Sequence, residues 1–395
     1  MIKLRSLVRC TLVCCLAPVA TQCGTRSAST GSVSAEIPHL RKQGTATQLV
    51  VDGKPFLALA GELANNSATS LEYMKPVWAK LVEAKLNAVL AGVSWAQIEP
   101  EEGKFDFSVP DGVIRDARSH NLRLVLLWFA SWKNGLSSYP PTWVKRDFER
   151  FPRAALVGGE TPWPVLTISN TVPRAKIVGS MSLELLSPFS DPNRDADARA
   201  FAALMRHVKE IDSQQHTVIM IQVENEVGMQ GDSRDRSAAA NTAYARPVPQ
   251  ELMDYLRQHK DSLMPEFRRV WEAAGFKTSG TWEEVFGKNT ATDEIFMAWS
   301  YARYVGRVAE AGKAEYPLPM YVNAALPRTS SIADEAAKKQ ESAKTGGYFA
   351  MGGPMADVMD IWRAGAPRID ILSPDAYNDF VEFCAKYDRS GVSGH

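Results

Sequence analysis

The sequence predicts an α/β protein built as a (β/α)8 TIM barrel that is truncated after its sixth strand. Six short apolar runs alternate with amphipathic helical patterns along the 395 residues, which is typical of a parallel sheet covered by helices. The clearest run, 122–128, has almost no polar alternation, as expected of a strand buried on both faces. No glycine fingerprint follows the first strand, which favours a barrel over a doubly wound sheet.

The expected elements follow one another in a regular order. Strands are expected at 55–60, 87–91, 122–128, 217–223, 321–324 and 369–372. The first helix is expected after a capping box in which Thr69 and Glu72 cap each other's backbone. Further helices are expected at 113–117, 196–211 and 355–363, with a long, partly helical insertion from Met229 onward.

The N-terminus has the pattern of a signal peptide over residues 1–23. Basic residues precede an apolar stretch, 7–20, that is too short to span a bilayer comfortably. We therefore expect export to the periplasm or the extracellular space. A lipid anchor at Cys23 is less favoured, because the residues before it lack the usual lipoprotein pattern. Residues 24–48 are expected to be a linker and the start of the barrel domain, which then occupies 49–395.

Charge and cysteine content narrow the function classes. The chain carries 45 basic and 45 acidic side chains, so there is no electrostatic reason to expect a nucleic-acid or membrane-surface partner. Four of the five cysteines lie in the leader and Cys384 stands alone in the body, which leaves no cysteine-based metal site. No metal or organic cofactor is expected, and the chemistry falls to carboxylates.

The most informative motif is the stretch 221–228, where an apolar strand runs into Glu224, Asn225 and Glu226. A barrel places its catalytic groups at the C-terminal ends of its strands. Strand alternation alone does not decide between the two glutamates, because the strand passes into a loop here. A surface turn with two solvated glutamates is the alternative, and an apolar strand leading into it favours the catalytic interpretation.

These residues resemble those of retaining glycosidases, and in particular the β-galactosidases of glycoside hydrolase families 35 and 42. The resemblance covers about 49–389 and rests on Asn225-Glu226, on the second-strand motif at 95–107, on Gly61-Glu62 and on the stretch 373–377. It implies hydrolysis of terminal β-D-galactosyl residues of oligo- or polysaccharides. Glu226 would be the general acid/base and Asn225 a donor to the sugar 2-hydroxyl group.

The resemblance also implies a nucleophilic carboxylate at the end of a seventh strand. No apolar run that ends in a glutamate follows Tyr377, and Glu382 lies in a helical pattern. We therefore expect the nucleophile beyond residue 395 and expect this chain to be inactive alone.

Other side chains are weaker candidates for substrate binding, each with a structural alternative. Tyr377 could orient the nucleophile or be a rim tyrosine, and Glu62 and Asn323 could bind sugar hydroxyls or fix loops. Trp95 could form the floor of the site or lie in the core, and Glu99 is expected to anchor its loop. Three further tryptophans could form a subsite wall or pack the core: Trp128, Trp132 and Trp143.

Two alternatives to a β-galactosidase remain open at this stage. One is a β-glucanase, mannanase or xylanase of the same superfamily, which shares the Asn-Glu pair. The other is a non-catalytic sugar-binding barrel. In each case the expected partner is a carbohydrate, and the sequence is compatible with a homo-oligomer.

Overall fold

The computed structural model describes residues 36–157, 184–325, 350–375 and 387. The expected signal peptide with Cys23, and also Tyr377, Glu382 and Cys384, lie outside the described residues.

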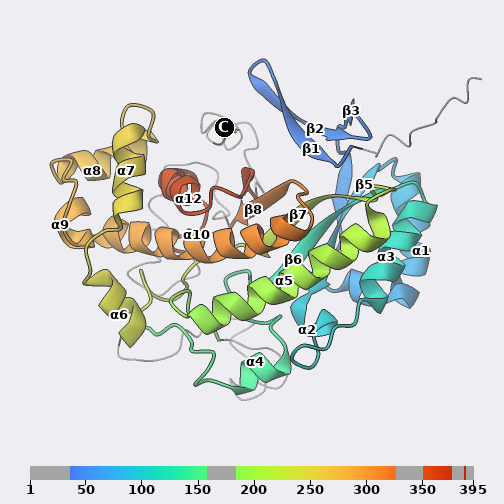
Figure 1. The fold of residues 1–395 in the computed structure, drawn as a ribbon, viewed down its shortest axis with the longest axis horizontal. Helices are drawn as coiled ribbons and strands as arrows, with labels where there is room; N and C mark the ends of the chain where they lie inside the picture. Colours follow the sequence, from blue (N-terminus) through green and yellow to red (C-terminus); the bar gives the residue numbers. More distant parts are fainter. Residues whose placement is uncertain (1–35, 158–183, 326–349, 376–386, 388–395) are drawn as a thin grey trace, which may run out of the picture. The chain divides into compact units, whose positions relative to one another are not determined.

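The central element is a six-stranded parallel sheet in which each strand pairs with the next along the chain (Figure 1). This sequential order is that of a barrel wall, whereas a doubly wound sheet reverses its strand order. The predicted α/β class and the six parallel strands are confirmed. The strands are β4 (Ala60–Glu62), β5 (Ala88–Ser94), β6 (Arg123–Lys133), β7 (Val218–Asn225), β8 (Met320–Ala324) and β9 (Ile371–Pro374).

Helices connect the strands, and the predicted insertion after β7 is helical. The two longest, α5 (Asp191–Asp212) and α10 (Thr290–Glu315), lie against each other (Figure 1). They approach closely at Gly312, where a Cβ atom would lie 2.2 Å from the Phe201 ring. The other helices are α1 (Leu71–Glu83), α2 (Trp95–Ile98), α3 (Ser108–Ser119), α4 (Thr142–Arg146), α6 (Ala238–Tyr244), α7 (Gln250–Gln258), α8 (Pro265–Ala273), α9 (Trp282–Phe286) and α12 (Met359–Gly365), with 3-10 turns at η1 (Ser67–Thr69) and η3 (Ala356–Val358).

The expected capping box at the start of α1 is wrong. Thr69 ends the preceding 3-10 turn, and the N-cap is Ser70, whose hydroxyl accepts from the backbone N–H of Tyr73 at 3.2 Å. The Glu72 carboxylate pairs with Lys75 instead. The helix therefore begins one residue later than the motif predicts.

The expected first strand at 55–60 is also wrong, because the barrel strand β4 begins only at Ala60. In the residues before β4, the backbone polar groups bond to the Asn87 side chain. This side chain donates to the Leu57 carbonyl at 2.8 Å and accepts from the Leu59 N–H at 2.7 Å. A side chain thus replaces the strand partner over this stretch.

The second half of the expected linker, 24–48, forms regular structure. Strand β1 (His39–Gln43) pairs with β2 (Ala46–Val51), which pairs with β3 (Lys54–Pro55), all antiparallel. Asp52 ties this hairpin to the sheet by accepting from Arg123 at 2.6 Å and contacting His216 Nδ1 at 2.8 Å. The small sheet is therefore part of the barrel domain.

The two faces of β6 belong to different hydrophobic clusters, as side-chain alternation along a strand requires. Even-numbered side chains from Leu124 to Trp132 join the main core, and odd-numbered ones from Val125 to Phe129 join a smaller cluster with Val51 of the hairpin. The strand is thus buried on both faces, as its sequence predicts.

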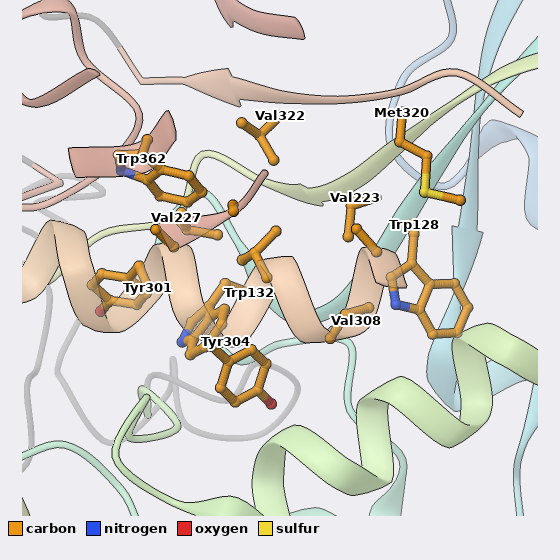
Figure 2. Close-up of a cluster of buried hydrophobic side chains, with 14 of the residues drawn as sticks. Trp128, Trp132, Val223, Val227, Tyr301, Tyr304, Val308, Met320, Val322 and Trp362 are labelled. Carbon is orange, nitrogen blue, oxygen red and sulfur yellow. The ribbon is translucent and has the colours of Figure 1, made fainter. Parts of the chain in front are cut away.

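Part of the main core lies between the sheet and α10, where aromatic and aliphatic side chains pack together (Figure 2). Trp132 of β6 meets two tyrosines of α10, with ring centroids 5.1 Å from Tyr301 and 4.5 Å from Tyr304. Trp128 and Trp132 are completely buried. Of the two roles that the sequence left open for them, packing of the core is therefore confirmed.

In the part of the chain that the structure describes, none of the helices combines the length and apolar character needed to span a bilayer.

Candidate active site

Polar side chains from five of the six strands, all except β5, meet where those strands end. Each lies within the last two residues of its strand or follows directly after it, and parallel strands bring their carboxyl ends to one edge of the sheet. We call these residues the strand-end cluster: Glu62, Lys133, Asn225, Glu226, Asn323 and Asp375.

Glu226 is held by backbone and side-chain contacts at the end of β7. Its backbone N–H donates to the side-chain oxygen Oδ1 of Asn323 at 2.9 Å, and the side-chain nitrogen of Asn323 donates to the Asp375 carboxylate at 2.8 Å. Asn323 is 4% exposed, so it links the ends of three strands. With both ends of its amide engaged, Asn323 acts on the cluster by positioning Glu226 and Asp375.

The backbone of the residues after Glu226 packs against the backbone of residues 350–351. Met229 exchanges two hydrogen bonds with Met351, at 2.8 and 2.9 Å. Gly228 has a φ of 153°, and a Cβ atom there would lie 2.5 Å from the Ala350 carbonyl carbon. Glycine is required because both the conformation and the close approach exclude a side chain. This packing holds the loop that leaves the strand-end cluster.

Asp375 and Glu226 form a hydrogen-bonded carboxyl pair. Burial, followed by the negative charge of Glu226, raises the pKa of Asp375 to about 7, while the hydrogen bond from Asn323 opposes the shift. Two carboxyl groups in contact do not both ionise readily, and such a pair holds one proton near neutral pH.

Lys133 supplies the positive charge of the cluster. Its ammonium donates to the Asn225 side-chain oxygen at 2.8 Å and lies 4.9 Å from the Phe129 ring centroid. Burial lowers the pKa of Lys133, and the charges of Glu226, Glu62 and Asp375 oppose that shift. Because Lys133 occupies the Asn225 oxygen, the Asn225 amide nitrogen remains as a donor.

Glu62, from β4, is the exposed member of the cluster. Partial desolvation, together with the charge of Asp375, raises the pKa of its carboxyl group, and Lys133 opposes the shift. Its carboxyl group is therefore within electrostatic reach of the buried pair and also open to solvent.

Glu224 belongs to a different, fully buried network. Its carboxyl oxygens accept from the backbone N–H groups of Ser131 at 3.2 Å and Trp132 at 2.7 Å. It also forms a hydrogen bond with Asp197, which accepts from the Trp128 indole at 2.9 Å and from the Ser131 hydroxyl at 2.5 Å. The structure thus separates the two glutamates that strand alternation could not rank.

The proton in this network resides on Glu224. Burial, and then the adjacent charge of Asp197, raises the pKa of Glu224 well above its usual value. Burial also raises the pKa of Asp197, but hydrogen bonds from Glu224, Ser131 and Trp128 oppose the shift. Asp197 is therefore the ionised partner of a protonated Glu224.

Trp95 does not reach the strand-end cluster. It is 0% exposed, and its indole N–H donates to Glu99 at 2.7 Å. The other Glu99 oxygen accepts from the backbone N–H of Gly103 at 2.8 Å, so Glu99 anchors its loop as expected. The expected role of Trp95 as the floor of the site is wrong, because a completely buried indole offers no face to a sugar. Trp143, which packs edge-on against Trp95, is only partly buried.

Sequence reasoning missed Lys133, Asp375 and Asp197. Lys133 ends β6, but the predicted run stopped at 128, so the sequence did not place Lys133 at a strand end. Asp375 lies inside the stretch that resembled the family, without an assigned role. Asp197 lies in a helical pattern and is identified only by its contacts.

We predict that Asp375 makes the stability of the chain dependent on pH. Its pKa is about 7 in the folded protein and about 4 when unfolded. The stabilisation from its protonation is therefore complete below about pH 4 and is lost as the pH rises through about 7. Between about pH 5 and about pH 8, the free energy of unfolding should fall more for the wild type than for Asp375→Asn.

Urea unfolding at the two pH values measures this difference. Asp261→Asn is the matched control, because the Asp261 side chain is 97% exposed, and it should follow the wild type. Identical pH dependence of the wild type and Asp375→Asn would contradict the assignment.

Among the described residues, no group of three or more His, Cys, Asp or Glu side chains is placed to hold a metal ion.

Comparisons with known proteins link one segment of the chain to a family. Residues 69–155 match the family model of the glycoside hydrolase family 42 β-galactosidases. This segment runs from the start of α1 to beyond β6 and includes the second-strand motif. The predicted resemblance to β-galactosidase-like glycoside hydrolases is confirmed. No curated protein matches the chain.

Solved structures of similar fold include two β-galactosidases and a β-amylase. The enzyme from Rahnella sp. R3 is 16% identical, with a TM-score of 0.45 over 81% of this chain and 39% of its own. The enzyme from Halorubrum lacusprofundi is 16% identical, with a TM-score of 0.41, and the match covers 81% of this chain and 40% of that enzyme. The β-amylase catalytic domain from Paenibacillus polymyxa is 13% identical, with a TM-score of 0.46, and the match covers 80% of this chain and 75% of that domain. The chain thus spans about two fifths of the length of these β-galactosidases.

Proposed function

We propose that the strand-end cluster is the acid/base side of a retaining β-galactosidase that removes terminal β-D-galactosyl residues from oligo- or polysaccharides. The observation that carries the proposal is the hydrogen-bonded pair of Glu226 and Asp375, next to Asn225 at the strand ends. The family match of residues 69–155 supports the substrate class.

The carboxyl pair provides the proton that glycoside cleavage needs. A glycosidic oxygen is a poor leaving group unless it is protonated, so a carboxylic acid must stay neutral near pH 7. The proton shared by Glu226 and Asp375 meets this requirement. The raised pKa of Asp375 puts this proton on Asp375 at rest. Glu226 would receive it through the hydrogen bond between the two carboxyl groups, donate it to the leaving oxygen in the first step and take a proton from water in the second.

Asn225 and Lys133 would position the sugar. Lys133 holds the Asn225 oxygen at 2.8 Å, so the amide nitrogen is available to donate to the 2-hydroxyl group. Glu62, on the exposed side of the cluster, would accept from another hydroxyl group. These contacts orient the anomeric carbon relative to Glu226.

The nucleophile is assigned to none of the cluster carboxylates. A retaining mechanism needs a second carboxylate about 5 to 5.5 Å from the acid. Asp375 is hydrogen-bonded to Glu226 and is therefore too close for this role. Following the resemblance, we place the nucleophile on a strand after β9, and from the leader at 1–23 we propose that the enzyme acts after export.

Hydrolysis of p-nitrophenyl glycosides tests the proposal. The longest natural form of the protein should release nitrophenol from the β-D-galactoside at least about tenfold faster than from the β-D-glucoside, β-D-mannoside and β-D-xyloside. The 395-residue chain assayed alone shows whether all required groups lie within it. Preference for another glycoside would favour the related glycanases, and no hydrolysis of any of them by the longest form would contradict the proposal.

A further inference from the structure

A cavity lies outside the strand-end cluster. It has a volume of about 290 Å³ and lies among Arg194 at the start of α5, the loop between α6 and α7, and the middle of α10. No residue of the strand-end cluster lines it.

Every charged residue that lines this cavity is an arginine: Arg194, Arg246 and Arg303. Arg194 pairs with Asp191 at 2.7 Å and Asp195 at 2.9 Å, whereas Arg303 only approaches Glu251, at 3.7 Å. Among the described residues, the exposed side chain of Arg246 has no ion-pair or hydrogen-bond partner. An unpaired guanidinium presents a planar fork of donors that matches the two oxygens of a carboxylate.

Aromatic side chains and prolines form much of the rest of the wall. The Arg303 guanidinium carbon lies 5.6 Å from the Trp299 ring centroid, and Phe189 stacks on Phe296 at 4.9 Å. Three prolines complete the rim: Pro188, Pro247 and Pro249. Aromatic walls favour a ring-shaped ligand. The volume is at the lower end of the range for ligand pockets, about 300 to 1,000 Å³, which limits the ligand to about one ring.

We propose that this cavity binds a single ring that bears a carboxylate, with the carboxylate on Arg246 and Arg303 and the ring against Trp299. Two classes of compound share this chemistry, acidic monosaccharides and aromatic acids. The site does not depend on the proposed hydrolysis, because it contains none of the groups assigned to that reaction.

Isothermal titration of the whole chain with D-galacturonate and with benzoate tests the proposal, and D-galactose serves as the uncharged comparison. We expect saturable binding of at least one acid and a dissociation constant at least about tenfold larger for Arg246→Ala, which is typical of a lost charged contact. Added salt should weaken binding. The matched control is Arg115→Ala on α3, where the side chain is 68% exposed, and its affinity should equal that of the wild type.

The outcomes separate the two sources of the ligand. Binding of D-galacturonate alone assigns the cavity to acidic sugars, and binding of benzoate alone assigns it to aromatic acids. Absence of saturable binding of both acids, equal affinity for D-galactose, or unchanged affinity in Arg246→Ala would each overturn the proposal. The last outcome would show that the acid binds elsewhere on the chain. Thermal melting of each variant confirms that it is folded.

Discussion

Replacing Glu224 by alanine should lower the free energy of unfolding by about 3 to 5 kcal/mol, the typical cost of removing one partner of a buried charged pair. The change would leave the backbone N–H groups of Ser131 and Trp132 without the acceptor that they have at 3.2 and 2.7 Å. It would also leave the ionised Asp197 buried without the proton donor that faces it. The expected loss is consistent with about 1 to 3 kcal/mol for each buried group that is left unsatisfied.

Two isosteric variants test the position of the proton in this network. Glu224→Gln should cost about 1 to 3 kcal/mol, because its amide can donate to Asp197 and accept from Trp132, whereas the Ser131 N–H, at 3.2 Å, loses its acceptor. Asp197→Asn should cost more, because the Asp197 oxygens accept from Trp128, Ser131 and Glu224, and an amide has only one oxygen.

Urea unfolding, monitored by circular dichroism, gives the free energy of unfolding of the three variants and the wild type. The expected order of destabilisation is Glu224→Ala, then Asp197→Asn, then Glu224→Gln. A loss for Glu224→Gln as large as that for Glu224→Ala would show that Glu224 is ionised, and the assignment of the proton would then be wrong.

Glu226→Gln should reduce hydrolysis of lactose by at least about 100-fold, because general acid catalysis contributes about 10² to 10⁴ in rate. The glutamine keeps the shape of the side chain but cannot donate a proton to the leaving sugar. The loss on p-nitrophenyl β-D-galactoside should be smaller in the glycosylation step, because nitrophenolate leaves without protonation.

This dependence on the leaving group distinguishes an acid catalyst from a residue that only supports the fold. kcat/KM, which reports the steps up to glycosylation, should be measured for both substrates with the longest natural form of the protein. Glu272→Gln, at an exposed glutamate of α8, is the matched control and should leave both values unchanged. Equal losses on lactose and on the nitrophenyl substrate would contradict the role of Glu226 as the acid.

The side-chain directions of the two glutamates at the end of β7 were not predictable from the sequence pattern. Strand alternation assumes extended backbone, whereas Glu224 has a φ of 60° and Glu226 a φ of 47°. In this conformation the alternation no longer applies. Their separation into a buried network and the strand-end cluster follows from partners on other elements, such as Asp197 and Asn323.

The order of strands and helices was determined by the sequence, because apolar periodicity and strand length are local properties. The apolar character of 122–128 predicted burial on both faces, and Asn225-Glu226 marked the end of β7 as the candidate site before any contact was known. The start of β4 was not predictable in this way, because Asn87 replaces its expected strand partner.

Only the tertiary structure decided which groups share a proton and which aromatic side chains are available to a ligand. Asp375 meets Glu226 because β8 and Asn323 lie between their strands. Trp95 is buried because Glu99 and Trp143 cover it. The pKa of a carboxyl group and the exposure of an indole depend on neighbours that are distant in the chain. Local sequence patterns do not identify these neighbours.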